Sequence, residues 1–232
     1  MLFRSKLVPL MFSLDEYYQI LIQDISVLHM FVNSVGYTVS ILLGQAVVIP
    51  MMAYALSRFE FRGRNAVFFM ILLLMILPFQ VTMVPNVLTL RQIGLLNTPW
   101  AVVLPMWFTP FYIFLIRQFM VGLPKDLYEA GQMDGAGTIR CYWQITLPVC
   151  RPIIGAAIAL SFADCWNLVE QPMTYLAQRQ DLQPLSVMFN QLVADSRGTE
   201  FAGAALYILP ALFVYLYFMK DILAGIQLTE MK

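Results

Sequence analysis

The sequence has little charge for its length. Only 12% of its residues are charged, and its 14 basic and 14 acidic side chains cancel, whereas a soluble globular domain is about 25% charged. With no excess of positive charge to attract a polyanion, the composition gives no support to DNA or RNA as a partner. Apolar residues replace the missing charge: 60% of the chain is hydrophobic, and the mean hydropathy is +0.71. The chain is therefore expected to lie in a lipid bilayer.

Residues that bind metals or form disulfides are also scarce. The three cysteines have no CxxC spacing, and His29 is the single histidine, so neither a metal site nor a disulfide framework is expected. Arg4, Lys6 and Pro9 interrupt the apolar start of the chain, so no cleavable signal peptide is expected. We expect one membrane domain, residues 28–232, after an extracytoplasmic or interfacial segment, residues 1–27.

Long runs without charge are present. A helix needs about 20 mostly apolar residues to cross the hydrocarbon core, and backbone groups in lipid must find their hydrogen bonds within the helix. The sequence thus predicts an all-α, polytopic transmembrane bundle of about five spans, at 30–57, 65–90, 92–116, 153–176 and 201–219. Pro85 and Pro105 are expected to break or shorten the second and third spans. Asp164 and Glu170 fall in the span at 153–176 and are expected to face the interior of the bundle.

Lysine and arginine indicate how the spans are oriented, because they accumulate on the cytoplasmic side of a membrane. If the loop at 58–64 is inside, the segment 117–151 and the C-terminus are inside too. Nine basic residues then lie on the cytoplasmic side and five on the other. The chain is expected to be a multi-pass protein of the cytoplasmic membrane with a cytoplasmic C-terminus.

A polar segment, about residues 122–152, separates two of the expected spans. Asp126 and Glu129 have the spacing of a capping box, which predicts a short helix at 126–133, and Gly135 suits the turn that follows. Thr138 is expected to cap a second short helix, which ends where Pro148 and Pro152 redirect the chain. Two such helices on the membrane surface would form a rigid knob. A DNA-binding helix-turn-helix is the alternative, but mixed charge between two bilayer spans does not favour it.

The residues of this segment resemble the EAA motif of permease subunits of bacterial ABC importers. The motif is carried by Glu129-Ala130, by Gly135, and by Ile145, Leu147 and Pro148. Gly131 stands where the motif has a second alanine, which lowers helix propensity by about 1 kcal/mol. The resemblance implies that nine residues couple the chain to an ATPase: Glu129, Ala130, Gly131, Asp134, Gly135, Ala136, Ile145, Leu147 and Pro148.

Further short matches resemble the carbohydrate-uptake branch of that family, the maltose-transporter type. They include Ala-Tyr-Ala-Leu-Ser-Arg at 53–58, Phe-Arg-Gly-Arg at 61–64, Gly-Leu-Leu-Asn-Thr at 94–98 and Trp-Asn at 166–167. The resemblance implies a MetI-like helical fold and a sugar as solute. It also implies four kinds of partner: a second homologous permease, a cytosolic ABC ATPase dimer that holds ATP and Mg²⁺, an extracytoplasmic solute-binding protein, and membrane lipid. No cofactor is expected on this chain. Family members usually have six spans, so the first is expected to be missing.

Five residues are candidates for the solute path: Asn33, Asp164, Trp166, Asn167 and Glu170. Acids inside a membrane often line a pathway, and tryptophan beside amides suits a sugar. Packing between helices is the slightly favoured alternative for Asp164, Trp166 and Asn167. An enzyme that uses Asp164 and Glu170 as an acid–base pair is disfavoured, because residues six apart do not share a helix face. A permease for a polyamine, a peptide or an anion remains an alternative.

Overall fold

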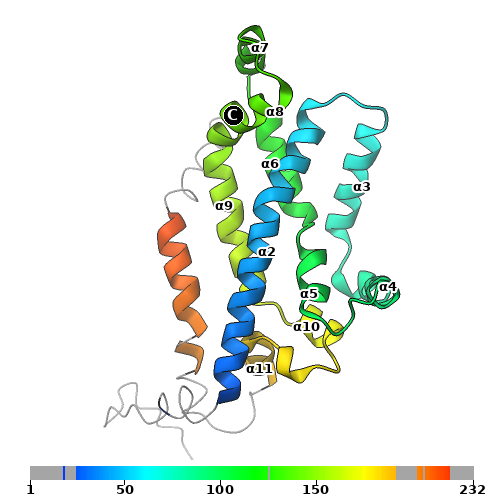
Figure 1. Cartoon of the computed structure of the whole chain (residues 1–232), viewed down its shortest axis with the longest axis vertical. Coiled ribbons are helices and arrows are strands. Elements are labelled where there is room, and N and C mark those ends of the chain that lie inside the picture. Colours follow the sequence, from blue (N-terminus) through cyan, green and yellow to red (C-terminus); the bar gives the residue numbers. More distant parts are fainter. Residues whose placement is uncertain (1–17, 19–24, 125, 192–202, 206, 220–232) are drawn as a thin grey trace, which may run out of the picture.

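The computed structural model describes residues 18, 25–124, 126–191, 203–205 and 207–219. All regular structure in this part of the chain is helical, which confirms the expected all-α bundle. Figure 1 shows helices running side by side along the long axis, with α7 and α8 at one end and α10 and α11 at the other. We call these the α7 end and the α10 end.

Three helical stretches are long and apolar enough to cross a membrane. The first is α2 (Ile25–Arg58), whose 34 residues extend about 51 Å at 1.5 Å per residue. The second joins α5 (Pro99–Met106) to α6 (Pro110–Val121), and the third runs from Thr138 to Trp166. A shorter apolar helix, Gly203–Met219, corresponds to the span expected at 201–219; residue 201 lies outside the described residues.

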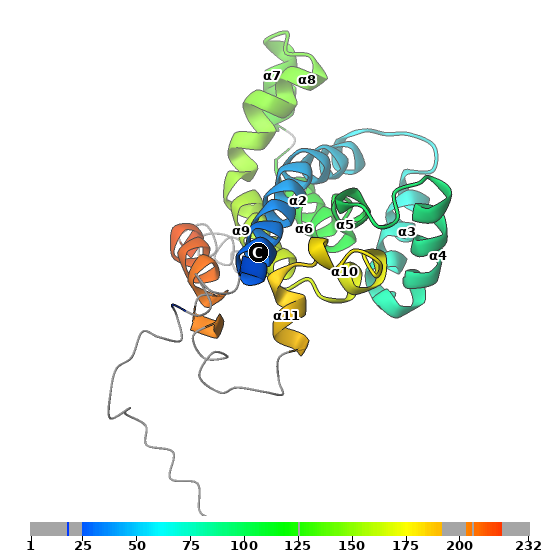
Figure 2. The same cartoon turned by 60° about the horizontal axis from the view of Figure 1, so that its bottom comes forward.

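The span expected at 65–90 is not one straight helix. It consists of α3 (Arg64–Ile76) and α4 (Phe79–Gln92), which are bent by 111°. Leu77 is extended, with φ −71° and ψ 125°, because the residue before a proline avoids the helical region. The break is therefore at Pro78, and Pro85 lies inside α4. Figure 2 shows α3 and α4 at one side of the bundle.

The expected break near Pro105 is present, whereas the bounds of two other spans need correction. In the expected third span, 92–116, Gln92 is the last residue of α4, the next helix begins at Pro99, and this helix breaks just beyond Pro105, between α5 and α6. The span expected at 153–176 ends at Trp166, after which the chain leaves the helix and starts α10 (Glu170–Tyr175). Glu170 therefore does not lie in a membrane-spanning helix.

Three apolar clusters lie among the described residues, and the two larger ones fill most of the bundle. The one toward the α7 end joins residues of α2, α3, α6, α7 and α9, and includes Ala53, Tyr54, Ile116, Tyr128 and Ile153. The one toward the α10 end joins α2, α5 and α10, and includes Tyr37, Ile41, Val102, Tyr175 and Leu176. A single continuous cluster thus extends from α7 into the transmembrane helices.

A polar layer lies about halfway along the bundle. Gln45 of α2 donates from Nε2 to the carbonyl of Met106 at 2.8 Å and to Oγ1 of Thr109 at 3.0 Å. Its Oε1 accepts a hydrogen bond from the hydroxyl of Ser161 in α9. These bonds satisfy buried polar groups that lipid cannot serve, and they tie α2, α9 and the α5–α6 break together.

Candidate functional site: the α7–α8 projection

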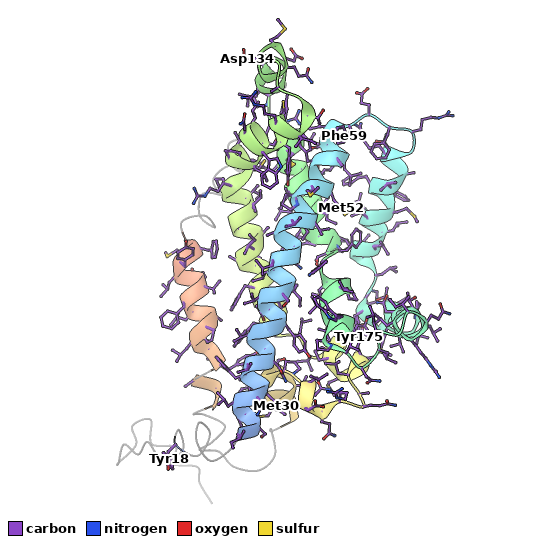
Figure 3. The ribbon with its side chains drawn as sticks, in the orientation of Figure 1. Tyr18, Met30, Met52, Phe59, Asp134 and Tyr175 are labelled. Carbon is purple, nitrogen blue, oxygen red and sulfur yellow. The ribbon has the colours of Figure 1, made fainter. Side chains whose placement is uncertain are left out.

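The segment 126–141 projects from the bundle at the α7 end, and Figure 3 places Asp134 at its tip. Its first helix, α7 (Asp126–Met133), has the bounds that the sequence predicts. Asp126 is its first helical residue rather than its N-cap. Since the first turn contains Asp126 and Glu129, both carboxylates lie near the positive end of the helix dipole.

The turn after α7 is closed by backbone hydrogen bonds. The N–H of Ala136 donates to the carbonyl of Gly131 at 2.9 Å, and the N–H of Gly135 donates to that of Gln132 at 3.0 Å. Gly135 has φ +75°, and this pair of bonds with a left-handed residue is the Schellman arrangement of a helix end. The turn is therefore as the sequence predicts, and glycine is required there because a Cβ disfavours this backbone conformation.

The outer surface of the projection is formed by predicted coupling residues. Glu129, Ala130, Asp134 and Gly135 are exposed, while Ala136 is partly buried. The carboxylate of Asp134 has no hydrogen-bond partner among the described residues. An acidic, small-residue surface is thus held at the tip by a closed turn.

The prediction of a separate second short helix is wrong. α8 (Thr138–Cys141) continues through a π-helical segment, η2 (Tyr142–Thr146), into α9 (Leu147–Trp166). Pro148 lies in the first turn of α9. The residue before it, Leu147, donates its N–H to the carbonyl of Tyr142, five residues earlier, which is the π-helical hydrogen bond. The π segment accommodates a proline that would break a regular α-helix. The N-cap is Gly137 rather than Thr138.

The coupling candidates Ile145, Leu147 and Pro148 consequently lie on the stem of the projection. Ile145 and Leu147 are partly buried against the cluster at the α7 end, and Pro148 is exposed. Gly131 is buried in α7, where an added Cβ would lie 2.6 Å from Cδ1 of Ile145 and 3.5 Å from Sγ of Cys141. This close approach of α7 to the stem gives a packing reason for glycine where the motif has alanine.

Two residues of α2 hold the projection, and sequence reasoning did not single them out. The guanidinium carbon of Arg58 lies 3.6 Å from the centroid of the Tyr128 ring, and the Tyr54 hydroxyl donates to the carbonyl of Thr138 at 3.2 Å. Tyr128 in turn shares a buried hydrogen bond of 3.0 Å with Thr146 of the stem. The family resemblance at 53–58 contains both Tyr54 and Arg58, so the sequence did carry a signal for these two residues.

Asp164 remains a candidate for the solute path in the structure. Its side chain is exposed on α9, and its Oδ2 accepts a 2.6 Å hydrogen bond from the hydroxyl of Tyr112 in α6. It lies one turn from Ser161 and therefore close to the polar layer. It borders a surface hollow with Asn167 and Glu170.

The other four candidates have partners within the chain. Asn33 donates to the carbonyls of Asp181 and Gln183 at 2.9 and 3.2 Å, and so fixes the segment between α10 and α11 (Leu185–Gln191). Trp166 is buried, and its Nε1 donates to the carbonyl of Tyr207 at 3.0 Å.

Asn167 and Glu170 are exposed. Asn167 accepts a 2.9 Å bond from the Tyr207 hydroxyl through Oδ1, while Oε1 of Glu170 accepts a 2.9 Å bond from Nε2 of Gln80. No cluster of metal-ligating side chains occurs among the residues that the structure describes.

Comparison with known proteins agrees with this arrangement. The family described as "binding-protein-dependent transport system inner membrane component" matches residues 36–223. The arabinooligosaccharides transport system permease protein AraQ of Halalkalibacterium halodurans is 29% identical over 205 residues, 87% of this chain and 73% of that protein. The diacetylchitobiose uptake system permease protein NgcG of Streptomyces coelicolor is 33% identical over 204 residues, 85% of this chain and 67% of that protein. The chain thus spans about two thirds to three quarters of these relatives.

A solved structure shares the fold. It is a crystal structure of a bacterial ABC transporter involved in the import of the acidic polysaccharide alginate, and one of its chains matches with a TM-score of 0.78 and 24% identity. The match covers 88% of this chain and 78% of that one. Because the family matches most of the sequence and the fold is shared as well, this chain belongs to the family of binding-protein-dependent transport system inner membrane components.

Proposed function

We propose that this chain is a permease subunit of a bacterial ABC importer, and that it moves a sugar or oligosaccharide across the cytoplasmic membrane. ATP and Mg²⁺ are bound by a partner ATPase, and the chain has no catalysis of its own. The observation that carries the proposal is the α7–α8 projection, which extends beyond the bundle and is joined to it by a continuous apolar cluster. A rigid projection of this kind transmits a displacement of its tip to the helices behind it.

The tip is proposed to dock on the ATPase dimer. Glu129 is exposed and acidic, so we assign it an ionic contact with a basic residue of the ATPase, and Ala130 is small enough for close approach. The buried Gly131 and the closed turn at Gly135 keep this surface in one shape. Movement of the ATPase pair would then shift the transmembrane helices between inward-facing and outward-facing arrangements.

The charge distribution supports an orientation. The described arginines that belong to the ends of helices or loops toward the α7 end are Arg58, Arg62, Arg64, Arg117, Arg140 and Arg151, whereas Arg91 in α4 and Arg179 after α10 lie toward the α10 end. Since basic residues accumulate inside, the α7 end is proposed to face the cytosol. The C-terminus, which lies outside the described residues, is proposed to be cytoplasmic as well. The α10 end is then the side on which an extracytoplasmic solute-binding protein delivers the solute.

A second permease subunit is proposed to complete the pathway. Large apolar side chains are exposed along α3, including Phe69, Met70 and Ile76, which are 58%, 62% and 75% exposed. Lipid and a homologous subunit are the surfaces that such side chains fit. Asp164 is exposed in the last turn of α9, close to the polar layer, where a carboxylate facing lipid would be costly, so we place it on the solute path between the two subunits.

The proposed class of solute is inferred from what similar proteins are described as transporting. AraQ and NgcG are described as permeases for arabinooligosaccharides and diacetylchitobiose, which are uncharged sugars. The matched importer of alginate carries an acidic polysaccharide, so an anionic solute is the second candidate. A carboxylate at Asp164 favours the uncharged class, because like charges at close range repel.

The test is reconstitution with the partner ATPase, the second permease and the solute-binding protein in liposomes. ATP hydrolysis stimulated by arabinotriose or diacetylchitobiose, with uptake of the same sugar, is the expected result. Co-purification of the ATPase should be lost when Glu129, Ala130 and Asp134 are all replaced by lysine. A matched triple lysine variant at the exposed Gln92, Ala177 and Gln180, toward the α10 end, should retain it. Retention of the ATPase by the first variant would contradict docking at the tip.

A further inference from the structure

Arg58 makes three contacts with two different elements. It is the last residue of α2, and its guanidinium lies on the ring of Tyr128 in α7, 3.6 Å from the centroid. Its Nη2 also donates to the carbonyl of Met120 at 2.8 Å and to that of Leu123 at 3.4 Å. One side chain therefore joins α2, the end of α6 and the projection.

The carbonyls that Arg58 binds suit a cation. Met120 lies in the last turn of α6, where carbonyls carry the negative end of the helix dipole, and its carbonyl also accepts a backbone bond from the N–H of Leu123 at 3.3 Å. A planar guanidinium can stack its face on an aromatic ring while all its donors remain in the plane for hydrogen bonds, whereas an ammonium group has no face to stack and must turn a donor toward the ring. The geometry therefore calls for arginine specifically rather than for a positive charge alone.

Tyr54, one turn before Arg58, holds the other arm of the projection. Its hydroxyl donates to the carbonyl of Thr138 at the start of α8, and its ring centroid is 5.0 Å from that of Tyr142. Residues four apart lie on the same face of a helix. The last turn of α2 thus contacts α7 through Arg58 and α8 through Tyr54.

A role for Arg58 in membrane topology alone would not produce these contacts. The one ion pair among the described residues joins Arg179 to Asp181, so no carboxylate within the described chain holds Arg58 in place. Arg58 is half-buried, and its Nε is buried without a hydrogen-bond partner in that part of the chain. A charge needed only on the cytoplasmic side would be expected to extend into water, as the exposed Arg62 does.

We propose that Arg58 is a positioning residue for energy coupling. It transmits displacement of α7 to α2 and α6, so that the projection and these two helices move together. The inference rests on the proposed function, since it assumes that an ATPase moves the projection. Arg58 does not itself contact the ATPase or the solute.

The experiment compares Arg58→Lys and Arg58→Gln with Arg62→Gln in the reconstituted importer. Arg58→Lys keeps the charge and loses the planar geometry, while Arg62→Gln removes an equal charge from an exposed site in the next loop. We measure retention of the ATPase subunit and the number of ATP molecules hydrolysed per sugar imported, with arabinotriose or diacetylchitobiose as the probe. Both Arg58 variants should retain the ATPase and hydrolyse about tenfold more ATP per sugar, on the scale of one lost charge-assisted hydrogen bond.

Two results would overturn the inference. One is a wild-type ratio of ATP to sugar in Arg58→Lys, which would show that a positive charge at position 58 is sufficient for coupling. The other is loss of the ATPase from the Arg58 variants, which would make Arg58 part of the docking surface. The proposed function fails separately, if the wild-type complex neither binds an ATPase nor imports a solute.

A second pair of variants covers the case in which Arg58 variants do not accumulate in the membrane. Tyr128→Phe keeps the ring face under Arg58 and loses only the bond to Thr146, whereas Tyr128→Leu removes the face. The inference expects a raised ratio of ATP to sugar in Tyr128→Leu and a smaller change in Tyr128→Phe. A wild-type ratio in Tyr128→Leu would count against it.

Discussion

Gly131 of α7 and Ile145 of the stem approach so closely that a Cβ on the glycine would lie 2.6 Å from Cδ1 of the isoleucine. Heavy atoms do not pack at that distance, so one of them must move when a side chain is added. The atom in the way is the far end of a flexible side chain, which can rotate. The contact therefore sets how closely α7 packs on the stem without forbidding alanine.

Gly131→Ala should change stability in a way that depends on residue 145. Alanine gains about 1 kcal/mol of helix propensity over glycine, and displacement of Ile145 offsets that gain. In an Ile145→Val background, which lacks Cδ1, the gain should appear, so the same substitution should raise the unfolding temperature. Thermal unfolding of the four purified forms in detergent measures this coupling. Equal shifts in both backgrounds would show that the contact has no energetic effect.

Gly135→Val should impair coupling, because Gly135 has φ +75° and a β-branched residue pays about 1–2 kcal/mol in that conformation. No atom lies within 4 Å of an added Cβ, so the effect comes from the backbone alone. Gly135→Asn is the matched control, since asparagine tolerates the left-handed region. The valine variant should reach the membrane with reduced sugar-stimulated ATP hydrolysis, and the asparagine variant should be close to wild type. Similar activity in both would remove the argument from backbone strain.

Gly44→Ala should destabilise the middle of the bundle. An added Cβ would lie 2.0 Å from Nε1 of Trp107, and that indole donates to the carbonyl of Ser40 at 3.1 Å. A rigid ring held in this way cannot move aside as Ile145 can, so a loss of about 1–3 kcal/mol is expected. Gly36→Ala, where nothing lies within 4 Å, should instead stabilise α2 slightly. Thermal unfolding distinguishes them, and a higher unfolding temperature for Gly44→Ala would refute the packing argument.

The parts of this protein that could be predicted from sequence are those set by local signals. The bounds of α7 and the turn at Gly135 follow from residues within a few positions of each other. The end of a helix at Pro148 is predicted wrongly. A proline removes a backbone donor, but the π segment before it lets the helix continue, and no local sequence pattern predicts a π segment. The contacts of Arg58 with Tyr128 and of Asp164 with Tyr112 join residues that are distant in the chain, so they required the fold.

The pair of Asp164 and Tyr112 leads to a prediction about the solute. Because Asp164 is exposed in the last turn of α9 and accepts one hydrogen bond from Tyr112 at 2.6 Å, its carboxylate has further acceptor sites for sugar hydroxyls. Asp164→Asn keeps an acceptor for Tyr112 and removes the charge, so the packing of α6 on α9 should survive. The KM for uptake of an uncharged sugar should rise about tenfold, as one charge-assisted hydrogen bond is weakened.

Leu160→Ala is the control for this prediction, since Leu160 is 47% exposed and lies one turn from Asp164 on the same side of α9 without a polar group. It should leave KM unchanged. Tyr112→Phe should raise KM less than Asp164→Asn, because it frees the carboxylate without neutralising it. Uptake by Asp164→Asn that matches wild type in both KM and kcat would assign the pair to packing of α6 on α9, which is the alternative that the sequence slightly favours.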